Sequence, residues 1–186
     1  ELLRRALLRY LHATTALELE VVNLAVSDLC RGSIALSLSA EERHEALQIY
    51  CDEAYHAVLA DDLAISCCGA VPARPPAFLG RLDAVRERHA RDDADGRLLR
   101  VWFTALTETA LSATMSTLSR SQVVAPAVRQ FVAEHARDEA RHAAWFGARL
   151  IGWWPALRPA EQQRWAPALA EFAPCFLGPD LEGIRA

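Results

Sequence analysis

Two histidines and a glutamate recur at helical spacing in the second half of the chain. His135 and Glu139 are four residues apart, and Glu139 and His142 are three apart. Residues separated by three, four or seven positions lie on one face of an α-helix. Imidazole nitrogens and a carboxylate that converge on one face can bind a metal ion. The stretch from 134 to 146 therefore predicts a metal-binding helix face.

The first half of the chain repeats part of this pattern. Residues 52–56 read Asp-Glu-Ala-Tyr-His, and residues 138–142 read Asp-Glu-Ala-Arg-His. Each half has a further glutamate upstream of the glutamate in this motif. Glu18 lies 35 residues before Glu53, and Glu108 lies 31 residues before Glu139. Each spacing fits one long helix, a turn and part of the next helix. The two halves predict one paired site with the metal ligands Glu18, Glu53, His56, Glu108, His135, Glu139 and His142.

Glu18 competes with Glu20 for the first of these positions. The residues three, four and seven positions from Glu18 are leucine, valine, alanine and threonine, whereas those around Glu20 include Asn23 and Ser27. The more apolar face favours Glu18 as the inward-pointing carboxylate, and we expect Glu20 to be solvated.

Four carboxylates on apolar helix faces need a compensating positive charge. No arginine or lysine lies on those faces, and a buried, uncompensated carboxylate costs several kcal/mol or takes up a proton. A single Glu-x-x-His is usually a surface pair, but two copies with a preceding glutamate each favour two divalent metal ions. The mixed oxygen and nitrogen ligands suit iron, with manganese possible, better than structural zinc.

Asp52 and Asp138 stand immediately before the motif glutamates. Neighbouring residues point about 100° apart around a helix, so neither aspartate easily binds the same ion. Each could instead accept a hydrogen bond from a ligand histidine on a neighbouring helix and fix its orientation. The alternative is a surface ion pair with Arg137 or Arg141.

The elements that must position these residues are helices. Periodicity predicts long helices at 2–30, 40–68, 97–118 and 126–151, and shorter ones at 78–89 and 159–170. Gly32 is a predicted helix end, Ser39 with Glu42 a predicted capping box, and Pro126 a predicted first turn. No segment alternates with period two. We predict an all-α fold, a ferritin-like four-helix bundle with a long crossover and additional short helices, rather than an irregular helical domain. It forms a single domain over 1–186, with a core at 1–152 and a C-terminal helical extension at 153–186.

Composition excludes several classes of partner. The net charge is -4 without a basic run, which argues against nucleic-acid binding. No apolar stretch reaches the roughly 18 residues of a membrane span. Five cysteines without a Cys-x-x-Cys pair indicate mostly buried thiols in a reducing, cytoplasmic setting. Glu1 in place of a methionine suggests that residues precede it, and the 52% apolar content with five tryptophans suggests a homodimer.

The order Glu18, Glu53-x-x-His56, Glu108 and Glu139-x-x-His142 resembles the ferritin-like non-haem di-iron oxygenases. His135, four residues before the second motif, is similar to the additional histidine of the p-aminobenzoate N-oxygenase (AurF-type) family. The resemblance covers residues 1–152, and the motifs connect nothing beyond residue 152 with that family.

The resemblance implies a ligand set and a reaction. One iron would be held by Glu18, Glu53 and His56, the other by Glu108, His135, Glu139 and His142, with Glu53 and Glu139 bridging. The enzyme would be a monooxygenase that uses O2 to oxidise an amine nitrogen of a small molecule in natural-product biosynthesis. Aryl amines would give hydroxylamine, nitroso or nitro products. Because no NAD or flavin motif is present, electrons would come from an external reductase or ferredoxin.

Two other functions fit the same ligands. One is a di-iron oxygenase acting on carbon, by hydroxylation, desaturation or C–C cleavage. The other is a ferritin-like ferroxidase or iron-storage protein, for which an acidic surface stripe would be expected and is not evident. His135 favours nitrogen chemistry through the resemblance alone.

Overall fold

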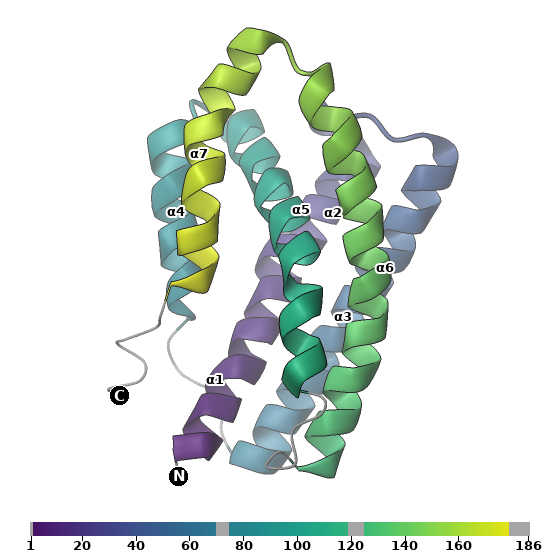
Figure 1. The fold of residues 1–186 in the computed structure, drawn as a ribbon, viewed down its shortest axis with the longest axis vertical. Helices are drawn as coiled ribbons and strands as arrows, with labels where there is room; N and C mark the ends of the chain where they lie inside the picture. The colour runs from purple at the N-terminus through teal and green to yellow at the C-terminus, as the bar shows by residue number, and fades with distance from the viewer. Residues whose placement is uncertain (1, 70–74, 119–124, 179–186) are drawn as a thin grey trace.

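Four long helical segments run side by side in the computed structural model of the chain (Figure 1). The structure describes residues 2–69, 75–118 and 125–178, and only the backbone of residues 2, 3, 68 and 111–118. None of these residues lies in a strand. The first segment comprises α1 (Leu2–Leu17), the π-helical turn η1 (Glu18–Val22) and α2 (Asn23–Arg31). The other three are α3 (Ala40–Cys68), α5 (Asp93–Leu118) and α6 (Pro126–Ala156).

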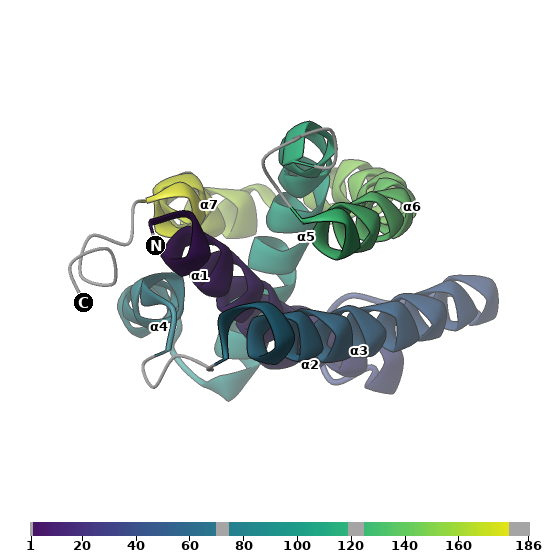
Figure 2. The same ribbon diagram turned by 90° about the horizontal axis from the view of Figure 1, so that it is seen from below.

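The four segments form two layers. The first segment and α3 lie on one side, and α5 and α6 on the other (Figure 2). Within each layer the two helices pack closely, and the layers meet where α2 contacts α5 and α3 contacts α6. The connection between the layers contains α4 (Ala77–His89), which packs against α7 (Pro159–Leu177). The predicted all-α bundle with a long crossover and additional helices is confirmed.

Local sequence signals fix several helix ends. Gly32 and Gly69 end α2 and α3 in the left-handed conformation, with φ of 63° and 69°, which a residue without Cβ adopts at low cost. Ser39 begins α3 with the predicted capping box. Its hydroxyl accepts from the backbone N–H of Glu42, and the Glu42 carboxylate accepts from the backbone N–H of Ser39.

The helices α5, α6 and α7 are each longer than predicted. α5 begins at Asp93 because the Asp92 carboxylate caps it, accepting from the backbone N–H of Asp95 at 2.9 Å. α6 continues past Gly152 and Pro155 to Ala156. The propensity of glycine and proline to end helices is therefore overridden by packing here, since Trp153 is buried.

The C-terminal helix shows the same override. The sequence predicts it for 159–170, but it extends to Leu177, with Pro167 and Pro174 inside it. Its last turns are held against α4, because Arg81 donates to the backbone carbonyl of Cys175 at 2.7 Å and to that of Gly178 at 2.9 Å. Burial of Phe172 and Cys175 adds apolar contact.

The first helix is not continuous as predicted. Between α1 and α2 the chain forms one π-helical turn, in which the backbone N–H of Asn23 bonds to the carbonyl of Glu18. Such a wide turn within an α-helix shifts the angular position of the residues on either side and is frequent at functional sites. Glu18, a predicted ligand, is its first residue.

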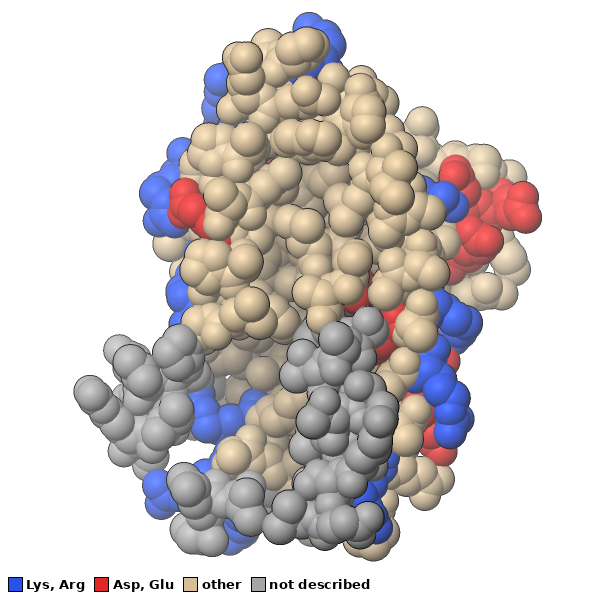
Figure 3. Space-filling model, in the orientation of Figure 1, with Lys and Arg blue, Asp and Glu red and all other residues tan. Residues whose placement is uncertain are grey.

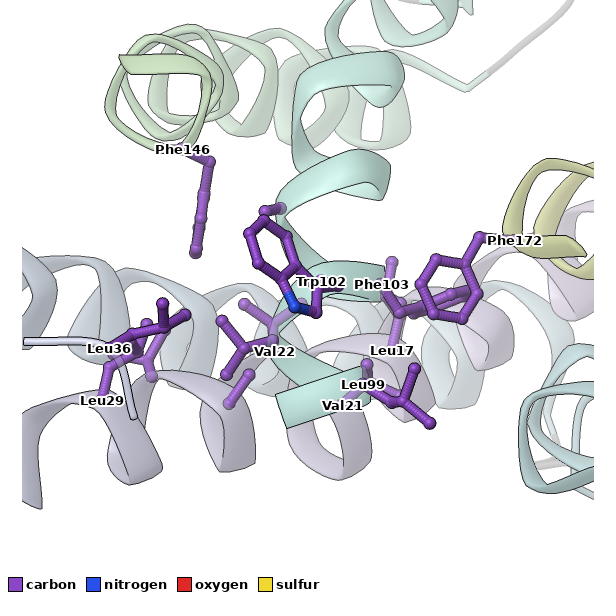
Figure 4. Close-up of a cluster of buried hydrophobic side chains, with 14 of the residues drawn as sticks. Leu17, Val21, Val22, Leu29, Leu36, Leu99, Trp102, Phe103, Phe146 and Phe172 are labelled. Carbon is purple, nitrogen blue, oxygen red and sulfur yellow. The ribbon is translucent and has the colours of Figure 1, made fainter. Parts of the chain in front are cut away.

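Two apolar clusters fill the bundle. The larger joins the first segment with α3, α4, α5, the end of α6 and α7; Trp102 of α5 lies near Val22 and Phe146 within it (Figure 4). Phe103 and Phe172 pack edge to face at 5.3 Å between ring centroids. The smaller cluster lies at the other end of the bundle and consists of Leu11, Ala60, Ala64, Val128, Phe131 and Val132.

The surface carries arginines and acidic side chains. All 20 basic side chains of the sequence are arginines, and on the face of α5, α6 and α7 they gather at the flanks (Figure 3). No helix among the described residues is long and apolar enough to cross a membrane. Cys51 and Cys67 are exposed free thiols, so the prediction that most cysteines are buried is wrong for them; the Cys68 side chain lies outside the described residues.

Candidate metal centre

The seven predicted ligands all lie in the interior of the bundle. None exposes more than 3% of its surface, and they come from four helical segments: Glu18 from η1, Glu53 and His56 from α3, Glu108 from α5, and His135, Glu139 and His142 from α6. Glu20 is exposed, as the apolar pattern around Glu18 predicted. On α3 and α6 these residues lie between the two apolar clusters.

The ligand atoms form two overlapping groups. Atoms of Glu53, His56, His135 and Glu139 lie within 4.8 Å of one another, and so do atoms of Glu53, Glu108, Glu139 and His142. Glu53 and Glu139 belong to both groups. Glu18 adjoins the first group, since its Oε1 is 3.7 Å from Nε2 of His135.

His135 lies in a different group from the one that the resemblance implies. Its ring centroid is 3.9 Å from that of His56, and it does not share the group of Glu108 and His142. The reason is axial position. A helix rises about 1.5 Å per residue, so His135 and His142 are separated by about 10.5 Å along α6, on opposite sides of Glu139. Spacing along one helix gives this separation, but not which residues of the other helices lie at the level of each histidine.

Many polar atoms of the site have no hydrogen-bond partner. They include Oε2 of Glu18, Glu108 and Glu139, Oε1 of Glu53, and Nδ1 of His135 and His142. Nδ1 of His142 is only 2.7 Å from Oε1 of Glu53, but the two atoms are not aligned as a hydrogen bond. Buried polar atoms are nearly always paired. Unpaired lone pairs of four carboxylates and imidazoles at this density fit bound cations.

The carboxylates respond differently to this environment. Burial, followed by the charges of neighbouring glutamates, raises the pKa of Glu18 and Glu108 well above the ordinary value. Burial also opposes ionisation of Glu53 and Glu139, but close contacts with His142 and His56, and with His135 and His142 respectively, outweigh it and lower both pKa values. Without cations, Glu18 and Glu108 therefore retain protons while Glu53 and Glu139 are ionised.

Each aspartate contacts a histidine of the opposite half. Oδ2 of Asp138 is 3.2 Å from Nε2 of His56, and Oδ2 of Asp52 is 3.3 Å from Nε2 of His142. In both imidazoles Nε2 thus faces an aspartate and Nδ1 faces the glutamates. A hydrogen on Nε2 leaves the Nδ1 lone pair directed into the cluster. Arg141, the alternative partner that the sequence suggests, also pairs with both aspartates.

Tyr10 is a neighbour of the site that the sequence patterns missed. It lies on α1 at spacings of four from Thr14 and eight from Glu18, which place the three on one face. Burial is the main cause that raises the pKa of Tyr10 to about 12; a hydrogen bond with Thr14 opposes it, and the carboxylates of Glu18 and Glu139 add to it. The four-residue spacing from Tyr10 to Thr14 and from Thr14 to Glu18 was the feature of the sequence that could have indicated this position.

The site approaches the surface between α3 and α6. A groove of about 440 Å³ lies there, lined by His142 together with Glu45, Trp145, Arg141 and others. Trp145 donates its indole N–H to Glu45 at 2.9 Å. The groove borders His142, whose imidazole is nevertheless fully buried.

Comparison with protein families agrees with this geometry. The family model described as p-aminobenzoate N-oxygenase AurF matches residues 1–184. The chain belongs to the AurF family. Members of this family are di-iron N-oxygenases, so the chain is an enzyme of the N-oxygenase family, and its buried Glu/His cluster is consistent with a di-metal site. The AurF match extends through α7, beyond the residues 1–152 that the motifs connected with the family. A search of curated proteins found no match.

Proposed function

We propose that the buried cluster holds two iron ions and that the enzyme uses O2 to oxidise an amine nitrogen of a small molecule. The observation that carries the proposal is the pair of overlapping Glu/His groups with unpaired, buried lone pairs. Membership of the AurF family supports nitrogen as the oxidised atom.

The overlap of the groups suggests how the ligands divide. Glu18, His56 and His135 would serve one iron, and Glu108 and His142 the other. Glu53 and Glu139 would bridge the two ions, because both groups contain them. Asp138 and Asp52 would orient His56 and His142 through the contacts at Nε2.

Charge supports two divalent ions rather than one. Four ionised glutamates carry four negative charges, which two divalent cations balance. Binding would expel the protons that Glu18 and Glu108 hold in the metal-free protein, whose pKa values burial raises. The Glu53 and Glu139 carboxylates are ionised beforehand and are the natural first contacts for an ion.

The chain contributes positioning and exclusion of water. Reduced iron would supply the electrons that activate O2. Around it, the two apolar clusters close both ends of the site, and a dry surrounding limits side reactions with water. The sequence offers no nucleotide-binding loop, so an external reductase or ferredoxin would provide the electrons. The substrate would be an amine, with aryl amines of natural-product pathways favoured by the family.

A direct experiment offers the iron-loaded protein a panel of aryl and alkyl amines with O2 and a reductant. Mass spectrometry should find hydroxylamine, nitroso or nitro products that depend on O2. Glu139→Gln should remove this activity, whereas Glu20→Gln, at an exposed glutamate, should retain it. Oxidation at carbon alone across the panel would contradict the proposal and favour a carbon-directed di-iron oxygenase.

A further inference from the structure

The two Asp-Glu-x-x-His motifs differ at one exposed position. The residue after the alanine is Tyr55 in the first half and Arg141 in the second. Both side chains lie on the surface, with Tyr55 59% exposed and the Arg141 side chain also 59% exposed. Only the second half therefore contributes a cation here.

Arg141 contacts the aspartates of both halves through one nitrogen. Its Nη2 is 3.1 Å from Oδ2 of Asp52 on α3 and 2.6 Å from Oδ1 of Asp138 on α6. A guanidinium NH2 group carries two hydrogens in a fixed plane, so one group can donate to both carboxylates. The contact to Asp52 connects helices from opposite halves of the chain.

The same two aspartates hold the two imidazoles. Asp138 uses Oδ1 for Arg141 and Oδ2 for His56, while Oδ2 of Asp52 accepts from both Arg141 and His142. These carboxylates are about one-third exposed, so without Arg141 they could turn towards water. The arginine is a cationic partner that the two aspartates share.

We propose that Arg141 is a positioning residue that fixes the orientation of both imidazoles by holding Asp52 and Asp138 in place. The inference rests on the proposed di-metal site. Arg141 pairs with the two aspartates and acts on the histidines through them. With both carboxylates fixed, Nε2 of each histidine keeps its hydrogen and Nδ1 stays directed at the metal position. One surface guanidinium thus sets the geometry of both halves of the site.

The test compares three variants with Co²⁺ as the probe. Arg141→Met keeps much of the side-chain stem but removes the donors, Arg141→Lys keeps the charge, and Arg137→Met changes an exposed arginine of the same helix as a matched control. The readouts are Co²⁺ affinity by absorption titration and solvent exchange of the imidazole N–H signals by NMR of the Co²⁺-loaded protein. The melting temperature monitors folding.

Arg141→Met should weaken Co²⁺ binding about tenfold, the lower end of the effect of outer partners of metal ligands. It should also speed exchange of the N–H signals of His56 and His142. Arg141→Lys should recover part of both effects, and Arg137→Met should change neither. Adding Tyr55→Arg to Arg141→Met should restore part of the loss, because that position is the equivalent one in the first half.

The possible outcomes separate the two proposals. If the wild type binds two Co²⁺ ions and Arg141→Met matches it in affinity and exchange, the arginine is a surface ion pair and the inference is overturned. A lower melting temperature of Arg141→Met, with affinity and exchange unchanged, would overturn the inference as well. A wild type that binds no Co²⁺ would overturn the di-metal site itself, and the role of Arg141 with it.

Discussion

The two halves of the metal centre share a layout, and three of the differences between them bear on its geometry. Glu18 begins a π-helical turn, whereas Glu108 lies in the regular helix α5. Four residues before the motif glutamate the first half has the apolar Ile49, and the second half has His135. Tyr55 and Arg141 form the third difference.

These differences show that a repeated motif does not make a symmetric site. The additional imidazole of the second half lies beside His56 of the first half, and the aspartates likewise serve histidines across the halves. Each group of ligands therefore contains residues from both halves of the chain. The group around His56 and His135 has two imidazoles, and the group around His142 has one.

The largest expected effect comes from the residues that both groups share. Glu53→Gln or Glu139→Gln should lower the affinity for both ions by about 100-fold or more, at least the upper end reached by changes outside the ligands. Iron analysis and titration measure this. Glu20→Gln is the control on an exposed carboxylate, and retention of two tightly bound ions in either variant would exclude a bridging role.

Removal of His135 should weaken the binding of only one of the two ions. His135→Ala should weaken one ion about 10- to 100-fold and leave the other near wild type, because His135 lies in a single group. His142→Ala should weaken the other ion. A stepwise Co²⁺ titration resolves the two. Unchanged binding in His135→Ala would remove His135 from the ligands, and equal loss of both ions would contradict the grouping.

The crossed aspartate contacts predict a pattern of coupling. Asp138→Asn should weaken metal binding about tenfold in the wild type, have no further effect in His56→Ala, and keep its full effect in His142→Ala. Asp52→Asn should show the reverse. Double-mutant cycles on Co²⁺ affinity measure both couplings, and coupling of Asp138 to His142 instead of His56 would contradict the contacts.

The smallest expected effect is a dependence of the melting temperature of the metal-free protein on pH. Burial and neighbouring charges raise the pKa of Glu18 and Glu108 above 4.5, so their stabilising contribution is complete below 4.5 and declines as pH rises. Burial lowers the pKa of His56 and His142, but close contacts with the negatively charged carboxylates outweigh it and raise both above 6.5. The metal-free melting temperature should fall as the pH rises above about 5, and further above about 6.5.

Ions should remove most of this dependence because they replace the protons. Calorimetry in buffers of different ionisation enthalpy should show proton release on Co²⁺ binding, with affinity rising with pH. Metal-free protein whose stability rises over that range, or binding without proton release, would contradict the assigned protonation of the cluster.

Hydrophobic periodicity was sufficient to predict which face of each helix is buried. It separated Glu18 from Glu20 and predicted the four long helices, because apolar spacing reports the angle of a residue around a helix. The offset between neighbouring helices along the bundle is not contained in periodicity, which is why the group of His135 was not predictable. No residue type in the sequence indicates the π-helical turn at Glu18. Pro167 and Pro174 favoured a shorter α7 than the structure has, because contacts with α4 determine its length.

One measurement tests the central claim most directly: iron content combined with magnetic spectroscopy of the oxidised protein. Two ions bridged by Glu53 and Glu139 should give two iron per chain and a magnetically coupled pair without the signal of isolated ferric iron. A single iron per chain, or two uncoupled ferric ions, would contradict a centre in which both halves share their carboxylates.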